Sequence, residues 1–225
     1  MKKLVLAAFI MGLVQLTFAQ RSYNLSGFDK VAFGTSGTCY VKQGSSFSVE
    51  IDGDDDDLDR LEVEVKGSRL VISTKNGSWK WNSGKITARV TLPEIEGLSV
   101  SGSGELITQG KITVDDLDMS VSGSGDLEVD VDGRGIDGRI SGSGKILAEG
   151  SADNIELSIS GSGKFSGENL KAKTVSARIS GSGNAKVYAT EEVDASISGS
   201  GTVYYKGDPK RKYANSSGSG KLRAL

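Results

Sequence analysis

The sequence predicts an all-β fold: a parallel β-helix with coils of about 19 residues, right-handed because crossovers between parallel strands favour that hand. Three observations predict it: a tetrapeptide that recurs at a nearly fixed interval, alternating apolar residues on both sides of it, and a composition rich in glycine but only 6% aromatic. Ser-Gly-Ser-Gly starts at Ser101, Ser122, Ser141, Ser160, Ser180, Ser198 and Ser217. These starts are 18 to 21 residues apart, which is typical of one structural unit stacked on itself.

The residues around each tetrapeptide alternate with the period of two that is typical of β-strands. The residue just before it is Val or Ile in the first six copies. The fifth residue after its first Ser is apolar in all seven copies: Leu106, Leu127, Ile146, Phe165, Ala185, Val203 and Leu222. A flexible Ser-Gly linker would not keep a fixed offset between two such strands. We therefore expect each coil to contain a strand, the tetrapeptide, a second strand and a turn.

The same alternation, continued through the tetrapeptide, points both glycines inward and both serines outward. The serines would then form two rows of hydroxyl groups along the stack, about 4.8 Å apart within each row. Two interpretations remain open for these rows: small surface residues beside a turn, or a recognition surface.

Residues 20–225 are expected to form a single elongated domain, with irregular coils and a hairpin over 20–97 and regular coils over 98–225. Aligning residues 33–41 with residues 100–108 places Cys39 on Leu106 and predicts a degenerate first coil over residues 28–44. Cys39 is then expected to be a small buried hydrophobic residue rather than a reactive thiol. Alternating residues 61–65 and 69–74 flank a turn and predict the hairpin.

Residues 1–19 have the pattern of a secretory signal peptide. Lys2 and Lys3 precede an apolar run over residues 4–16, and Ala19 supplies the small residue before the expected cut. The run is too short for a transmembrane anchor, and no second apolar segment follows. The exported chain would lose two lysines, so its net charge would change from −2 to −4, which argues against a nucleic-acid partner.

Catalysis has few candidate residues in this sequence. There is no histidine, which excludes histidine-based catalysis and histidine-ligated metals. Parallel β-helices include enzymes that act on polysaccharides with acidic clusters, but their clefts are walled by long loops, and these coils are short and regular. We expect no enzymatic activity, with a polysaccharide-acting enzyme as the alternative.

The densest acidic segment covers residues 52–59. Asp52, Asp54 and Asp56 alternate around Gly53 and are the candidate ligands for Ca²⁺, the one cofactor that the sequence suggests. The spacing does not match an EF-hand loop, in which the twelfth residue is a bidentate Glu, because the twelfth residue counted from Asp52 is Val63. A solvated acidic loop without metal is the alternative interpretation.

Trp79 and Trp81 are the candidate binding residues. Both lie on one face of an extended segment, with turn residues on either side. Exposed paired rings could stack on sugars or dock a partner, since large apolar groups at exposed sites tend to mark interaction surfaces. The alternative is that they pack over the open end of the helix as a structural cap.

Several segments together resemble a known family. They are Val31-Ala32-Phe33 before a Gly/Ser turn, the hairpin over 61–74, and the run from Thr91-Leu92-Pro93-Glu94-Ile95 into residues 98–104, followed by Ser-Gly-Ser-Gly coils. The chain resembles, over about residues 24–222, the head GIN domain of putative auto-transporter adhesins, which is abundant in secreted proteins of Bacteroidota. The resemblance implies a parallel β-helix at the envelope of a Gram-negative bacterium, in the periplasm or at the cell surface.

The functional expectation follows from the export signal, the stacked surface and this resemblance. We expect an adhesin-like or scaffold protein of the cell envelope that binds a glycan or a surface protein, with homo-oligomers possible. The rival hypothesis is an oligomeric structural envelope protein without a ligand. The family supplies no catalytic motif that could be transferred to this chain.

Overall fold

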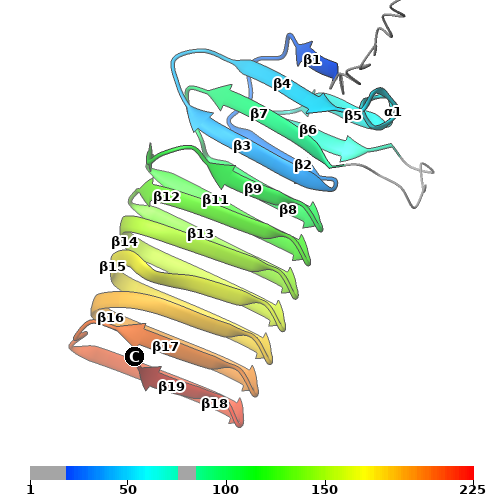
Figure 1. Cartoon of the computed structure of the whole chain (residues 1–225). Helices are drawn as coiled ribbons and strands as arrows, with labels where there is room; N and C mark the ends of the chain where they lie inside the picture. The colour runs from blue at the N-terminus through cyan, green and yellow to red at the C-terminus, as the bar shows by residue number, and fades with distance from the viewer. Residues whose placement is uncertain (1–18, 76–84) are drawn as a thin grey trace, which may run out of the picture.

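The computed structural model describes residues 19–75 and 85–225 and confirms a solenoid of stacked parallel β-coils (Figure 1). The predicted signal peptide, apart from Ala19, lies outside the described residues. In chain order the elements are β1 (Ala19–Tyr23), β2 (Lys30–Gly34), β3 (Gly37–Gln43), β4 (Ser48–Gly53), α1 (Asp55–Leu58), β5 (Leu61–Lys66), β6 (Arg69–Thr74), β7 (Ile86–Leu92), β8 (Gly97–Gly102), β9 (Glu105–Thr108), β10 (Ile112–Thr113), β11 (Asp116–Gly123), β12 (Asp126–Asp132), β13 (Gly135–Gly142), β14 (Lys145–Gly161), β15 (Lys164–Gly181), β16 (Asn184–Gly199), β17 (Thr202–Lys206), β18 (Arg211–Gly218) and β19 (Lys221–Ala224).

Each Ser-Gly-Ser-Gly lies at a corner of the solenoid and joins two strand segments. We call the segments before the tetrapeptide the leading strands: β8, β11, β13, residues 154–161 of β14, 174–181 of β15, 192–199 of β16, and β18. We call the segments after it the trailing strands: β9, β12, residues 145–152 of β14, 164–172 of β15, 184–189 of β16, β17 and β19. Parallel pairing stacks each tetrapeptide on its equivalent, as Ser122 on Ser141 and Ser141 on Ser160.

The inward positions predicted from the alternation form the core. The residues directly before the first six tetrapeptides are at most 3% exposed: Val100, Val121, Ile140, Ile159, Ile179 and Ile197. On the trailing strands, Leu106 stacks on Leu127 and Leu127 on Ile146, and all three are buried. Each coil therefore buries its aliphatic side chains between its own two strands and against its neighbours, so stability is shared along the stack.

The expectation that both glycines point inward is wrong for the first glycine of the tetrapeptide. Gly142 is only half-buried, with φ +116, a backbone conformation that glycine adopts without the steric cost of a Cβ atom. The chain turns there, so strict alternation stops, and only the second glycine, such as Gly144, is buried. The serines of the first six tetrapeptides are exposed, as predicted.

The N-terminal coils are stacked in an order that differs from their order in the chain. The first coil, β2 and β3, is confirmed, with Phe33 on Val100 and Cys39 on Leu106, as the alignment predicts. On its other side β2 pairs with β6, and β3 pairs with β7. The strand pair β6–β7 thus lies at the outside of the stack, although it follows β2–β3 in sequence.

Antiparallel strands close this N-terminal end. β5 pairs with β6 as the predicted hairpin, β4 pairs with β7, and β1 pairs with β4 (Figure 1). The other end of the stack is different: β18 and β19 continue the parallel pairing, and all residues of β18 are exposed. Lys212, Ala214 and Ser216 replace there the buried apolar residues of the preceding coil, so the last coil presents polar groups at an open end.

Candidate functional site

A groove of about 730 Å³ lies on the side of the solenoid opposite the Ser-Gly-Ser-Gly corners. It lies where chain connections enter β8, β11 and β13, next to the start of β2 and the end of β3. Its charged lining is predominantly acidic: Glu94, Glu96, Asp115, Asp116, Asp118 and Asp137 against Lys30 and Arg134.

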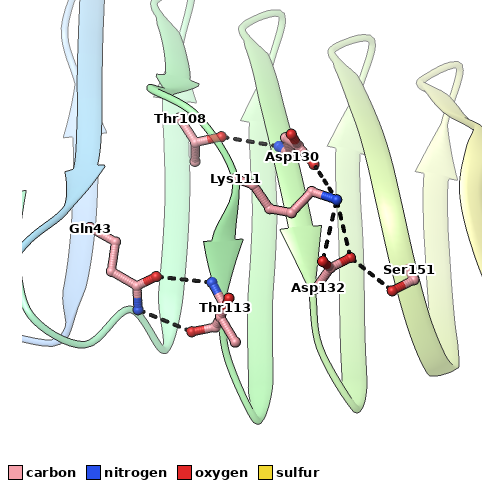
Figure 2. A network of polar contacts seen from close by, with 7 residues as sticks. All are labelled: Gln43, Thr108, Lys111, Thr113, Asp130, Asp132 and Ser151. Carbon is pink, nitrogen blue, oxygen red and sulfur yellow. Dashed lines mark hydrogen bonds and ion pairs between the residues drawn. The ribbon is translucent and has the colours of Figure 1, made fainter.

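The lengthened first interval between tetrapeptides shapes one wall of this groove. Ser101 and Ser122 are 21 residues apart, and the additional residues form the turn between β9 and the short strand β10. The side chain of Gln43 holds this segment (Figure 2). Its Oε1 accepts a hydrogen bond from Thr113 N–H at 2.9 Å, and its Nε2 donates to the Thr113 and Pro93 carbonyl oxygens at 3.0 and 3.3 Å. β3 ends at Gln43, so its side chain supplies the hydrogen bonds to Thr113 that a continuing strand would have made with its backbone.

A second set of polar contacts fixes the neighbouring strand β12 (Figure 2). Lys111 Nζ lies 3.3 Å from Asp132 Oδ2 and 3.8 Å from Asp130 Oδ1, and the Ser151 hydroxyl donates to Asp132 at 2.8 Å. The hydrogen bond from Ser151, followed by that from Lys111, lowers the pKa of Asp132. The hydrogen bond to Asp132 raises the pKa of Lys111, so both groups are charged at neutral pH.

Ion pairs neutralise part of the acidic lining. Arg139 contacts Asp118 at 3.0 Å and Asp137 at 3.3 Å, and its hydrogen bond to Asp118 is the main cause of its raised pKa. Arg134 contacts Asp115 at 3.0 Å, and Lys30 contacts Glu96 at 3.5 Å. These pairs are solvent-exposed and contribute little to stability, so their main effect is to orient the side chains.

Two carboxylates of the groove keep their charge uncompensated. Within residues 19–75 and 85–225, neither Glu94 nor Asp116 has an ion-pair partner. The groove therefore offers free carboxylate oxygens as acceptors, next to the guanidinium donors of Arg134. Such a set of groups is suited to a ligand with many hydroxyl groups or with positive charge.

The predicted metal ligands are distributed over several elements. Asp52 lies on β4 and pairs with Arg89, Asp54 precedes α1, and Asp56 lies in α1 with Arg60 at 3.8 Å. The acidic run forms this one-turn helix because its carboxylates lie in the first turn, where they interact favourably with the free N–H groups. In the described part of the chain, no three His, Cys, Asp or Glu side chains come close enough to hold a metal ion.

The predicted binding residues Trp79 and Trp81 lie outside the described residues. The groove itself contains residues that no motif of the sequence singles out, such as Asp115 and Asp116. The available signal was the 21-residue interval, the longest of the series, combined with the acidic residues within it.

No helix in the described residues is long and apolar enough to span a membrane. Cys39, the single cysteine, is fully buried, and desolvation raises the pKa of its thiol to about 12. Its position agrees with a packing role and gives no reactive thiolate at neutral pH.

Comparisons with known proteins support the same architecture. The chain is similar to a solved putative adhesin from Bacteroides fragilis, with 27% identity, a TM-score of 0.87, and coverage of 93% of this chain and 98% of that chain. It is also similar to a putative lipid binding protein from Parabacteroides distasonis, with 26% identity, a TM-score of 0.76, and coverage of 94% and 98%. A putative adhesin from Parabacteroides merdae, 20% identical over 94% of this chain and 97% of that one with a TM-score of 0.75, shares the fold. No curated protein sequence matches the chain.

The family comparison covers most of the molecule. Residues 27–209, from the connection before β2 into the turn between β17 and β18, match the family model described as putative auto-transporter adhesin, head GIN domain. The matched segment contains the swapped N-terminal coils, the acidic groove and six of the seven tetrapeptides. The chain therefore belongs to the family of head GIN domains of putative auto-transporter adhesins.

Proposed function

We propose that this protein is an exported, adhesin-like component of the bacterial cell envelope that binds a glycan in the acidic groove. The observation that carries the proposal is the groove of about 730 Å³, which lies in the size range of ligand sites but is lined mainly by charged and amide groups. Hydroxyl groups of a sugar can donate to the carboxylates of Glu94 and Asp116 and accept from Arg134. The ion pair with Asp115 holds Arg134 in place before a ligand arrives.

A lipid ligand is less well matched to this groove. One relative is described as a putative lipid binding protein, but the groove here carries six acidic side chains against two basic ones. Anionic head groups would be repelled, and acyl chains would find few apolar partners. A cationic segment of a surface protein is the second candidate, because the uncompensated carboxylates favour positive charge.

A glycan array tests the proposal with two matched double variants. Glu94→Gln with Asp116→Asn removes the two unpaired groove charges without breaking an ion pair. Glu191→Gln with Asp194→Asn removes the same charge from β16, away from the groove. We expect the wild type and the β16 variant to bind the same glycans, and the groove variant to bind at least about 10-fold more weakly, equivalent to about 1.4 kcal/mol.

The outcomes against the proposal are distinct. Equal binding by both variants would place recognition elsewhere, and equal loss in both would indicate a general charge effect. The absence of any retained glycan, together with capture of cationic peptides by the wild type only, would favour the protein ligand.

Export is tested separately from binding. The predicted signal peptide implies that the chain recovered from the envelope or the medium begins at Gln20. N-terminal sequencing or intact mass would show this start, and a chain that retains Met1 in the cytoplasm would contradict export.

A further inference from the structure

The outward side chains of the trailing strands change charge sign halfway along the stack. We call this surface the trailing face. Its outward positions in the coils of β9, β12 and early β14 include the acids Glu105, Asp126, Glu128, Asp130 and Glu149. In the later coils they include the bases Lys164, Lys186, Lys206, Lys221 and Arg223. Lys145 stands at the boundary, next to Asp126 in the parallel register.

The regular coils over residues 98–225 show the same polarity as a whole. Residues 98–160 contain twelve Asp and Glu against four Lys and Arg, whereas residues 161–225 contain five against eleven. The two halves thus carry net charges of −8 and +6. A separation of this size along one axis gives the molecule a strong field of opposite sign at its two halves.

Much of the charge on the trailing face is not neutralised by the chain itself. In the described residues, ion pairs reach Asp130, through Lys111, and Lys186, through Glu168. Within the same ranges, Glu128, Lys164 and Arg223 form none. On the leading strands, Arg139 and Arg211 are paired with acids of adjacent coils, whereas Arg178 forms no ion pair within these ranges.

A column of outward side chains, half of them apolar, runs along the middle of the trailing face. Parallel register places Tyr40 beside Ile107, and the column continues through Glu128, Leu147, Ser166, Lys186 and Tyr204 to Arg223. Tyr40, Ile107, Leu147 and Tyr204 are all half-exposed. Apolar groups in line between charged rows are the composition expected of a contact surface.

We infer that the trailing face binds a second copy of this chain, with the two stacks antiparallel and related by a two-fold axis. An antiparallel second copy sets acidic coils against basic coils at both halves, whereas a parallel copy would set like charges together. An anionic lipid surface or a cationic protein would match only one half. A two-fold contact is self-complementary, so both halves are satisfied by one arrangement.

The central column agrees with this arrangement. With the axis between the coils of Leu147 and Ser166, the coil of Glu128 faces the coil of Lys186 in the second copy. In the same arrangement the coil of Ile107 faces that of Tyr204, and the coil of Tyr40 faces that of Arg223. In register, Glu128 thus meets an opposite charge and Ile107 meets a second half-exposed apolar side chain. This inference does not depend on a ligand in the acidic groove.

Two charge-reversed variants test the inference. The first carries Lys164→Glu, Lys186→Glu and Arg223→Glu, which reverses three of the five bases named above. The second carries Glu105→Lys, Asp126→Lys and Glu128→Lys, which reverses three of the five acids. We expect sedimentation velocity at low salt to show the wild type as a dimer, each variant alone as a monomer, and their equimolar mixture as a heterodimer.

Salt and a matched single variant complete the test. The wild-type dimer should dissociate as salt rises, because the Debye length falls from about 30 Å at 0.01 M to about 3 Å at 1 M. Lys164→Glu should weaken dimerisation at least about 10-fold, whereas Arg178→Glu, the same change on a leading strand, should leave it within about 2-fold. Circular dichroism would confirm that every variant keeps its β-structure.

Three results would overturn the inference. One is a wild type that stays monomeric at low salt, with no heterodimer from the mixed variants. Another is an Arg178→Glu variant as disruptive as Lys164→Glu, which would indicate net charge alone. The third is a monomer whose basic half binds phosphatidylglycerol vesicles, because that surface would then serve an anionic lipid.

Discussion

A Cβ atom placed on Gly144 would lie 2.5 Å from Cγ1 of Val121 in the preceding coil. It would also lie 2.4 Å from the Gly125 carbonyl oxygen, which cannot move without disturbing the parallel pairing. The second glycine of the tetrapeptide is thus required for the close approach of successive coils at their corner. The solenoid keeps a uniform spacing because each buried glycine leaves room for the aliphatic residue of the coil before it.

Gly144→Ala should therefore destabilise the protein by about 1–3 kcal/mol, the usual cost of overpacking a filled core. Thermal and urea unfolding would measure the loss. Ser143→Ala, one residue earlier and exposed, is the control and should stay within about 0.5 kcal/mol of the wild type. Equal stability of the two variants would show that the corner can accommodate a methyl group, contrary to the close packing of successive coils.

Ile159→Asp should cost more than about 4 kcal/mol, because Ile159 is 2% exposed and an Asp there would place an unpaired charge in the core. Ser158→Asp puts the same group on the adjacent outward position and should be tolerated. The melting temperatures of the two variants decide the matter. An Ile159→Asp protein that melts like Ser158→Asp would refute the inward assignment of this column.

Gln43→Glu should loosen the wall of the acidic groove. The new carboxylate would lose the donor to the Thr113 and Pro93 carbonyl oxygens and would lie against them, at a cost of about 1–3 kcal/mol. Repulsion from these two carbonyl oxygens should displace the side chain whose Oε1 accepts the hydrogen bond from Thr113 N–H in the wild type, so this amide should exchange faster. Gln109→Glu, at an exposed position nearby, is the control, and similar exchange in both variants would argue against the bridging role.

Cys39 should make stability depend on pH in the alkaline range. Burial raises the pKa of its thiol from 9.0 to about 12, so the unfolded chain releases this proton first as pH rises. The contribution of the buried, protonated thiol to the free energy of unfolding is fully present below pH 9 and is lost between about pH 9 and 12. Unfolding curves of the wild type and Cys39→Ala should differ in slope over that window, and a thiol reagent should label Cys39 only after unfolding.

Ser151→Ala should raise the pKa of Asp132 toward its ordinary value of 3.8, because the Ser151 hydroxyl is the main cause of the lowered pKa. In the wild type this lowered pKa contributes stability above about pH 3.8, and the contribution is lost as pH falls through the lower value in the folded chain. A carboxyl ¹³C NMR titration would measure the pKa directly. Ser143→Ala, which is far from Asp132 in the coil, should leave the titration unchanged.

Much of the regular stack could be predicted because two local patterns reinforce each other. The tetrapeptide marks the same corner in every coil, and the period of two fixes which residues face inward, so even Cys39 in the degenerate coil was placed on Leu106. The rule failed at Gly142, where a backbone with positive φ interrupts the alternation. A sequence pattern alone does not show at which glycine the chain turns.

The groove could not be predicted, because it depends on the order of the coils in space. Lys30 and Gln43 belong to the first coil, whereas Glu96 and Asp116 come from segments that stack on it only after the chain has formed β4 to β7. No local pattern over residues 44–92 indicates that the chain leaves the first coil on one side and returns on the other. Lys30 and Asp116, 86 positions apart, therefore line one surface without a sequence signal.

The swapped stacking of β6–β7 and β2–β3 also separates the molecule into a part of fixed length and a part of variable length. The β2–β3 coil pairs with β6–β7 on one edge and with β8–β9 on the other, and both partners come later in the chain. Removal of any one of these three strand pairs would expose an edge of a neighbouring pair. A regular coil beyond β9 contacts only its two neighbours, through the same corner and the same register. Duplication or deletion of such a coil leaves both new neighbours compatible, so evolution can lengthen or shorten this protein at its C-terminal half while the N-terminal block stays constant.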